Sequence, residues 1–586
     1  MTVRRTIARL GPLRGGAIAV ALGWSFVPIA LLAYHTLVHG GVLSGSDGPL
    51  AGADQLFYMD SIRQSAQHVL IGDNFALALG QRVFLNPLYL VAGVVWLIGV
   101  PLQAAFWSLN LLAAPALALG TVAVAARALP PGRGRVAAVA IALFYFSPVL
   151  PMLRWTGTGS ALTHYALLIP TGESMPAWQL WGYPHAGVTT GALAASLLAM
   201  VTLATRLRAP GRKLVDVRRL LIATSLAGCL VGWLHPWQGA TLIGVSIVLA
   251  IDTRSRRVAA ALAVPALATG APMVYEYILS RTDAAWRVDS IQNAAGHDPL
   301  WMLLAALLPL AIPAAFGVRA LAAGPLRTVL IAWPVTGLVV YYATDQFPYH
   351  ALQGLSIPMA VLAVAGWQRY ARGRPVALSY AAVLAATAIT VPGAIYELQT
   401  FHDSERTGAA PYWFTPGDHG ALAYLDRLKA PGAVLATQYL GLAVPAFTGR
   451  RTWVGDYTWT PQFTVRAVLA EQLMAGELSP AQARRVVESV GARYVLTDCA
   501  TPAPLLGRWL GPLVVSRRSF GCATVYELRP VASARSSSRS SAAWNPASVN
   551  RAAVAAPPTR ILSRTPGSSA RRAAALARPP ASPGSN

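Results

Sequence analysis

Residues 86–126 read NPLYLVAGVVWLIGVPLQAAFWSLNLLAAPALALGTVAVAA, and their division into helices decides the fold of the chain. A helix needs about 20 mostly apolar residues to cross the roughly 30 Å of a bilayer's hydrocarbon core. Residues 102–126 are long enough for this. Residues 86–100 form a shorter apolar run that opens on Asn-Pro. This run is predicted either as a span or as an interfacial or re-entrant helix.

Basic residues in the loops decide between these two interpretations. Lys and Arg concentrate in the cytoplasmic loops of membrane proteins. All basic clusters of this chain fall on one side only if residues 86–100 do not cross. We therefore predict an interfacial or re-entrant helix there, a cytoplasmic N-terminus, and an extracytoplasmic segment after residue 396. The clusters are Arg4/Arg5/Arg9/Arg14, Arg127/Arg133/Arg135, Arg206/Arg208/Arg212/Lys213/Arg218/Arg219, Arg254/Arg256/Arg257, Arg319/Arg327 and Arg369/Arg372/Arg374.

Composition also indicates a mainly α, polytopic membrane protein. The 586 residues are 55% hydrophobic and 12% charged, with a mean hydropathy of +0.47, whereas soluble proteins carry about 25% charged residues. An ordinary cytosolic enzyme is excluded. The net charge of +24 would suit a nucleic-acid binder, but the basic residues stand between apolar runs, so we predict no nucleic-acid partner. The eleven predicted spans are 16–38, 102–126, 135–153, 186–205, 220–235, 237–251, 258–279, 300–318, 326–343, 351–368 and 376–396.

The chain is predicted to have three domains. Residues 1–396 form the helical bundle of about 11 spans plus interfacial helices. Residues 397–530 mix charged and apolar residues in short blocks, which predicts a small exported α/β domain. Residues 531–586 are rich in Ser, Ala, Pro and Arg and hold no acid, which predicts a disordered basic tail. Helices are expected at 417–429, 461–475 and 479–490, and strands at 433–437, 451–455, 493–498, 513–518 and 523–528.

Two of the three cysteines suggest a disulfide. Cys229 lies in a predicted span, whereas Cys499 and Cys522 each flank a predicted strand of the exported domain. Because disulfides persist outside the cytoplasm, we predict a bond between Cys499 and Cys522; the alternative is two independent buried thiols. No CxxC pair and no His/Cys spacing typical of zinc occurs. No metal ligands and no certain cofactor are predicted, although a divalent metal stays open.

The first predicted outer loop carries the strongest functional signal. It reads GADQLFYMDSIRQSAQHVLIGDNFALALGQRVFLNPLYL (52–90) and places Asp54 a short way past the first span. The segment after Asp54 is amphipathic, as in helices that lie flat at the membrane interface. A carboxylate there could meet the headgroup of a lipid-linked substrate. No predicted span has a carboxylate at its centre, where a coupled transporter usually places one, so a transporter is disfavoured.

Further stretches follow this loop in a particular order. They are residues 86–129, WLHPWQG (233–239), YYATDQFPYHALQGLSIPMAVLAVAG (341–366) and the exported block 415–498. In that order the loop and these stretches resemble the GT-C superfamily, the multi-span glycosyltransferases that use polyprenyl-phosphate-linked sugars. Together they cover most of the chain apart from the tail. This chain has a lone Asp54 where many family members carry paired acids.

The resemblance implies a GT-C fold and an inverting transfer of sugar from a polyprenyl phosphate to an acceptor hydroxyl. A polyprenyl phosphate leaves readily, so one outward carboxylate suffices as the base for the acceptor. We predict Asp54 in that role; the alternative is that Asp54 caps the interfacial helix. Asp60 lies six residues later, off the same helical face, and is the second candidate.

Five further residues are candidates for substrate binding. Glu173 is the only acid of the second predicted outer loop, which suits a second carboxylate or a metal ligand. His185 follows a group of aromatic residues that could stack on a sugar or form an interfacial belt. His235 could bind phosphate or simply end a helix. Arg281 and Arg287 could hold a lipid phosphate through paired N–H donors, or be ordinary surface charge.

The predicted function is therefore a glycosyltransferase of the cell membrane, surrounded by membrane lipid. Its partners would be a polyprenyl-phosphate-linked sugar and an extracytoplasmic envelope glycan, lipid or protein as the acceptor. Two alternatives from other classes stay open. One is a lipid-glycan transporter or flippase, and the other is a non-catalytic envelope assembly protein.

Overall fold

The chain forms two compact units in the computed structural model. The described residues are 3–48, 52–77, 81–209, 214–375, 377–407, 412–501 and 503–530. The predicted basic tail, residues 531–586, lies outside them. Of the described residues, those up to 38 and within 45–72 and 81–402 belong to unit 1, and those within 39–44, 73–77 and 403–530 belong to unit 2.

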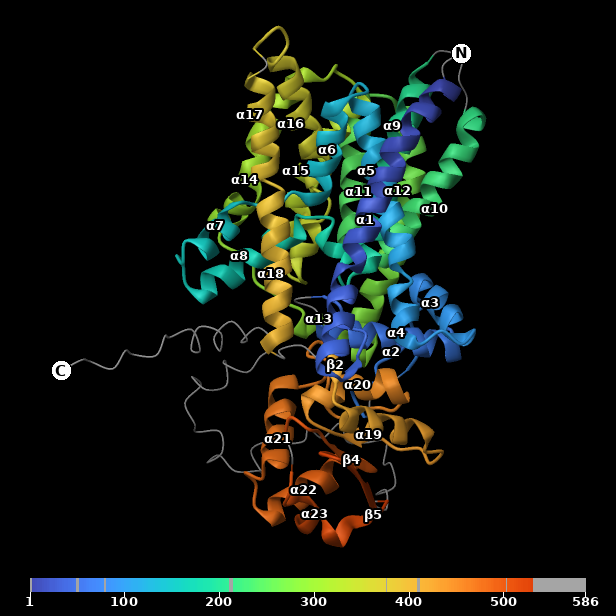
Figure 1. Ribbon diagram of the computed structural model, residues 1–586. Helices are drawn as coiled ribbons and strands as arrows, with labels where there is room; N and C mark the ends of the chain where they lie inside the picture. Colours follow the sequence, from blue (N-terminus) through green and yellow to red (C-terminus); the bar gives the residue numbers. More distant parts are fainter. Residues whose placement is uncertain are drawn as a thin grey trace, which may run out of the picture. The chain divides into compact units, whose positions relative to one another are not determined.

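Unit 1 is helical. Figure 1 shows many of its helices running alongside one another, with α5, α9, α11 and α12 among them. The elements are α1 (Val3–His39), α2 (Gly52–His68), α3 (Pro87–Leu97), α4 (Leu102–Trp107), α5 (Asn110–Ala128), α6 (Arg133–Phe144), α7 (Val149–Trp155), α8 (Ala161–Glu173), η1 (Trp178–Leu180), α9 (Pro184–Arg208), η2 (Leu214–Val217), α10 (Arg218–Leu234), α11 (Pro236–Thr253), α12 (Arg256–Thr282), α13 (Ala284–Gln292), α14 (Leu300–Gly317), η3 (Val318–Ala320), α15 (Pro325–Ala343), η4 (Pro348–Leu352), α16 (Ser356–Tyr370), α17 (Ala377–Ala388) and α18 (Val391–Thr407).

Eight helices of the described chain are long and apolar enough to cross a membrane. The pair α6 and α7, bent by 63°, makes a ninth if it counts as one span. The predicted spans 220–235 and 237–251 correspond to α10 and α11, which are not among the eight. The chain is thus a multi-pass membrane protein. The eight are Gly11–His39, Leu102–Ala128, Pro184–Arg208, Arg256–Thr282, Leu300–Ala320, Pro325–Ala343, Pro348–Tyr370 and Ala377–Glu405.

The segment that decides the topology contains a short helix. Helix α3 has 11 residues, which at 1.5 Å per residue is about half the thickness of the hydrocarbon core. Asn86 caps it by accepting hydrogen bonds from the backbone N–H groups of Leu88 and Tyr89. Helix α3 packs on α2 at Gly93, where a Cβ atom would lie 3.1 Å from the Ile62 carbonyl oxygen. The two helices therefore form one layer, and α3 alone is too short to cross.

Small residues bring the long helices of unit 1 together. A Cβ atom on Gly191 of α9 would lie 2.3 Å from the Ala116 carbonyl oxygen of α5. A Cβ atom on Gly317 of α14 would lie 1.8 Å from the Leu362 carbonyl oxygen of α16. Such close backbone approaches are typical of helix pairs in membranes, where packing rather than water exclusion drives association.

Helix α18 extends further than the predicted last span. It continues to Thr407, and the candidate span Ala377–Glu405 includes Glu397, whose side chain is fully buried. The expectation that the exported domain begins at residue 397 therefore differs from the division of the chain at residues 402 and 403. A carboxylate also lies inside a candidate span, although toward its end rather than its centre.

Unit 2 is a small α/β unit that contains two sheets. Strands β1 and β2 pair antiparallel, and a four-stranded sheet has the order β3-β4-β6-β5, in which only the β3–β4 pair is parallel. The predicted strand 451–455 contributes only a single bridge, between Thr452 and Val434. The elements are β1 (Val42–Leu43), β2 (Trp413–Phe414), α19 (Pro416–Arg427), β3 (Val434–Leu435), α20 (Gln438–Thr448), α21 (Phe463–Ala475), α22 (Pro480–Val490), β4 (Tyr494–Thr497), α23 (Leu506–Trp509), η5 (Gly511–Leu513), β5 (Val514–Phe520) and β6 (Ala523–Leu528).

Local sequence explains the helices of unit 2. Ser479 and Gln482 form a capping box at the start of α22, with Pro480 in the first turn. Helices α21 and α22 pack apolar side chains, among them Leu473 and Val487, into the main core of the unit. Cys499 and Cys522 are disulfide-bonded, with a Cα–Cα distance of 4.9 Å. The bond joins the loop after β4 to the turn before β6.

Candidate functional site

Four aromatic side chains from distant parts of unit 1 meet in one cluster. Tyr183 and His185 flank the start of α9, His235 lies between α10 and α11, and His350 lies on η4. The ring centroids of Tyr183 and His185 are 3.8 Å apart, and those of His235 and His350 are 4.9 Å apart. We call these four residues the Tyr-His cluster.

A proline fixes the backbone at the start of each of the three helices, α9, α11 and η4, that carry or adjoin the cluster residues. Pro184, Pro236 and Pro348 all occupy the first turn of the helix that begins there. Proline suits this position because its missing N–H group would have no helical partner. The break between α10 and α11 leaves His235 in an extended conformation, with φ of −158°. The cluster side chains are therefore held at helix starts.

Glu173 supports the cluster through hydrogen bonds. Its Oε2 atom accepts from Nε2 of Gln353 at 2.7 Å and from Nε2 of Gln179 at 3.1 Å. Nδ1 of His350 lies 3.5 Å from the same oxygen. On its other side, Nε2 of His350 lies 2.8 Å from the Tyr183 hydroxyl. A buried carboxylate at the end of α8 is thus connected to a phenol at the start of α9.

Asp54 lies near the same cluster. It is half-buried in the first turn of α2, inside the helix rather than at the position before it. Burial raises the pKa of Tyr183 well above its usual value, and the carboxylates of Glu173 and Asp54 add to the shift, while a hydrogen bond with Tyr58 opposes it. The ring of Tyr58, one turn after Asp54, is 6.0 Å from that of Tyr183 and 5.3 Å from that of His185.

Several cluster atoms lack a hydrogen-bond partner among the described residues. They are Nδ1 of His185 and both ring nitrogens of His235, all of them buried. Buried polar atoms are normally satisfied, so exceptions require an explanation. The structure therefore brings four predicted residues to one place and leaves two of them with unused hydrogen-bonding groups. The four are Asp54, Glu173, His185 and His235.

The other predicted residues lie elsewhere. Asp60 is fully buried in α2 and accepts a hydrogen bond from Nε2 of Gln64 at 2.8 Å. Arg287 donates to the carbonyl oxygen of Arg281, whose guanidinium lies over the ring of Tyr277. Among the described residues, neither arginine makes a hydrogen bond or ring contact with the Tyr-His cluster. The described part of the chain also holds no group of three or more His, Cys, Asp or Glu placed to bind a metal ion.

Sequence reasoning missed His350, Gln353 and Asp47. His350 and Gln353 lie within the stretch 341–366, but only their contacts with Glu173 reveal a role. Asp47 is buried and neither of its carboxylate oxygens has a hydrogen-bond partner among the described residues. Its backbone N–H donates to Oε1 of Gln55 at 2.6 Å, the residue next to Asp54.

Replacing Asp47 with Asn is expected to flatten the dependence of stability on pH. Burial raises the pKa of Asp47, so the folded protein binds this proton more tightly than the unfolded chain. Wild-type stability should fall as pH rises from about 4, the ordinary value for Asp, toward the raised pKa. Thermal unfolding of the detergent-solubilised protein between pH 4 and 8 measures this. Equal slopes for wild type and D47N would contradict it.

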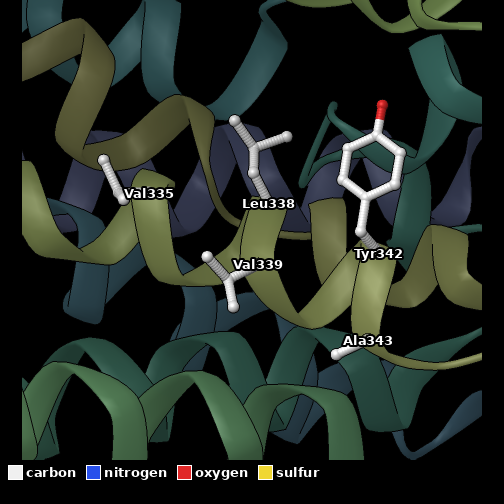
Figure 2. A pocket seen from close by; sticks show the side chains of 5 residues that line it. All are labelled: Val335, Leu338, Val339, Tyr342 and Ala343. Carbon is white, nitrogen blue, oxygen red and sulfur yellow. The ribbon is translucent and has the colours of Figure 1, made fainter.

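A shallow apolar hollow runs along α15. It is lined by Val335, Leu338, Val339, Tyr342 and Ala343 and has a volume of about 450 Å³ (Figure 2). These positions recur every three to four residues and therefore share one face of the helix. Val339 is 61% exposed. The helix ends at Ala343, shortly before η4 and His350.

Comparison with solved structures shows the fold. The Archaeoglobus fulgidus oligosaccharyltransferase in the apo form matches with a TM-score of 0.52 and 11% identity, over 83% of this chain and 70% of that one. The same enzyme tethered to an acceptor peptide matches with a TM-score of 0.50 and 12% identity, over 88% of this chain and 74% of that one. ArnT from Cupriavidus metallidurans bound to undecaprenyl phosphate matches with a TM-score of 0.45 and 15% identity, over 87% of this chain and 98% of that one. No family model and no curated protein matches the sequence.

The class of the protein follows from these observations. It is a multi-pass membrane protein with an α/β unit at its C-terminal end. Its fold is similar to that of the Archaeoglobus fulgidus oligosaccharyltransferase, in agreement with the fold that the sequence resemblance implied.

Proposed function

We propose that this protein is a membrane glycosyltransferase that moves a sugar from a polyprenyl-phosphate donor to an extracytoplasmic cell-envelope acceptor. The observation that supports this most is the position of Asp54. Its half-buried carboxylate is electrostatically coupled to Tyr183, at the edge of a cluster with three imidazoles. The fold adds support, because the Archaeoglobus fulgidus enzyme AglB, which shares it, is solved in complex with a dolichol-phosphate.

The charge pattern supports an extracytoplasmic site. Helices α9 and α11 both begin at the Tyr-His cluster. Helix α9 ends at Arg206 and Arg208, and α11 is followed by Arg254. Because basic residues concentrate on the cytoplasmic side, the cluster would face the opposite side. The N-terminus, with its own arginines, would be cytoplasmic, and unit 2 extracytoplasmic.

The proposed reaction uses Asp54 as a general base. The Asp54 carboxylate takes the proton of an acceptor hydroxyl while that oxygen attacks the anomeric carbon of the donor sugar. The bond between this carbon and the phosphate oxygen breaks, and the polyprenyl phosphate leaves with the bonding electrons. Attack from the face opposite the phosphate inverts the anomeric centre. Asp60 would support the fold of α2 through its bond with Gln64.

His185 and His235 would bind the phosphate. A phosphate oxygen would accept hydrogen bonds from their ring N–H groups, and Nδ1 of His185 and both ring nitrogens of His235 have no partner among the described residues. Hydrogen bonds from protein donors to a charged oxygen are stronger than those between neutral groups. The lipid tail would then lie against an apolar surface such as the hollow of α15. Inversion requires that the phosphate and the base then lie on opposite sides of the anomeric carbon.

Deletion of the gene tests the proposal directly. Without the protein, one sugar is expected to be missing from an envelope glycan, lipid or protein, and its polyprenyl-phosphate donor should accumulate. Glycan composition and extracted lipid-linked sugars, measured by mass spectrometry, report both. A donor trapped on the cytoplasmic face would indicate a flippase instead. Unchanged glycans and donors would indicate an assembly protein.

A further inference from the structure

We propose that Tyr183 is the hydroxyl that donates a hydrogen bond to the departing phosphate oxygen, and that Glu173, Gln353 and His350 position it. This inference rests on the proposed function and adds a residue to its site. It also assigns Glu173 a positioning role, in place of a metal ligand or a second reacting carboxylate.

The argument begins at the buried carboxylate. The side chain of Glu173 is 6% exposed, and three groups crowd its Oε2 atom. A carboxylate only accepts hydrogen bonds, so the amide nitrogen of Gln353 must face it. Glu173 thus fixes the orientation of the Gln353 side-chain amide, with its nitrogen toward the carboxylate. It has little freedom to contact a substrate itself.

The Gln353 amide then decides which nitrogen of His350 carries the proton. Its Nε2 atom lies 3.1 Å from Nδ1 of His350, closer than the 3.5 Å between Nδ1 and the Glu173 carboxylate. One N–H of the amide donates to Glu173, and the other has two acceptors in reach, Nδ1 of His350 at 3.1 Å and Oε1 of Gln179 at 3.3 Å. With the shorter contact made, Nδ1 of His350 accepts, and the proton of a neutral imidazole is then on Nε2. The Nε2–H group donates to the Tyr183 oxygen at 2.8 Å.

This arrangement leaves the O–H group of Tyr183 free to donate to a substrate. The hydrogen bond with Tyr58 lowers the pKa of Tyr183, which is the effect of a donor on the phenol oxygen. The oxygen of Tyr183 therefore accepts from both His350 and Tyr58, and its own proton points elsewhere. Burial, Glu173 and Asp54 all raise the pKa of Tyr183, which keeps the phenol protonated and therefore a donor. Tyr183 is only half-buried, whereas Glu173 behind it is buried. The hydrogen-bonded chain therefore runs from the buried Glu173 to a side chain that is partly exposed.

The surroundings indicate that the ligand atom is negatively charged. His185, whose ring contacts Tyr183, and His235 bring further ring nitrogens that have no hydrogen-bond partner among the described residues and that could donate to it. An acceptor hydroxyl would need a base, which Asp54 supplies. A phosphate oxygen needs donors, and a preorganised donor stabilises the charge that develops there as the sugar leaves.

The test measures binding of a C55 polyprenyl phosphate and of the corresponding polyprenol to the purified full chain in nanodiscs. Wild type is expected to prefer the phosphate. Y183F should weaken phosphate binding about tenfold, the size of one hydrogen bond to a charged group, and leave polyprenol binding unchanged. H350A should lose no more affinity for the phosphate than Y183F does. The double variant Y183F/H350A should bind the phosphate as tightly as Y183F, because His350 acts through Tyr183. H350Q, which keeps an amide near the hydroxyl, should recover most of the affinity.

Matched controls separate the possible outcomes. Y380F, at an exposed position on α17, and H164A, at a half-buried position on α8, make the same chemical changes outside the Tyr-His cluster and should bind like wild type. An unchanged phosphate preference in Y183F overturns the inference, as does an equal loss for phosphate and polyprenol. Additive losses in the double variant overturn the positioning role of His350. A wild-type protein with no preference for the phosphate would instead overturn the proposed function itself.

Discussion

Replacing Asp54 with Ala is expected to lower the rate of sugar transfer by about 10²- to 10⁴-fold, the usual contribution of a general base. Asp54 is half-buried near Tyr183. The other nearby carboxylate, Glu173, does not substitute easily because its amide and imidazole neighbours occupy it. The amide of D54N keeps the shape but takes no proton, so D54N should be as inactive. Transfer from labelled donor in membranes, normalised to protein level, measures both.

The control for this prediction is D345N. Asp345 lies in the exposed segment between α15 and η4, and its replacement should leave the rate within about twofold of wild type, as expected for a surface change. Polyprenyl-phosphate binding should survive in D54N, since the phosphate is held by other residues in the proposal. Full transfer by D54A would remove Asp54 from the mechanism.

Loss of the disulfide is expected to have the second largest effect. Cys499 and Cys522 are 23 residues apart, and closing a loop of this size stabilises a fold by about 3 kcal/mol through the unfolded state. The variant C499S/C522S should therefore expose unit 2 to protease at far lower temperature or denaturant than wild type. Limited proteolysis of the full-length protein in detergent, followed by mass spectrometry, locates the cleavage in unit 2.

Cys229 provides the matched control. It is a free cysteine of α10 in unit 1, and C229S should leave the proteolysis of unit 2 unchanged. Alkylation before and after reduction adds an independent check, because wild type should expose two additional thiols only after reduction. Alkylation of all three cysteines without reductant would contradict both the bond and an extracytoplasmic unit 2.

Much of the fold could be predicted because hydrophobicity and charge act locally. The length of residues 86–100 together with the positions of the arginines predicted a short helix, and α3 is one. The end of the last span was harder. Charged residues after 396 suggested that the membrane region had ended, yet α18 continues and buries Glu397. Burial of a carboxylate depends on neighbours such as Trp178 and Arg154, which a local pattern does not contain.

The candidate site could likewise be predicted from the sequence only in part. Residue type and predicted side of the membrane selected Asp54, Glu173, His185 and His235, which do lie near one another. The same reasoning selected Arg281 and Arg287, which lie elsewhere, because being on one side of a membrane does not make two residues neighbours. The pairing of Tyr183 with His350 joins positions 167 residues apart. Only the packing of η4 against α8, α11 and α15 in three dimensions reveals it.

Unit 2 is assembled from separated pieces of chain, which has a consequence for biogenesis. Strand β1 pairs with β2, and the backbone N–H of Thr452 donates to the carbonyl oxygen of Asn74. During synthesis, residues 39–44 and 73–77 leave the ribosome more than 300 residues before their partners. They must wait, unpaired, until nearly every span has been inserted. Unit 2 can therefore be completed only after synthesis has passed β6. A chain truncated earlier would leave residues 39–44 and 73–77 without their partners, where quality-control proteases could recognise them.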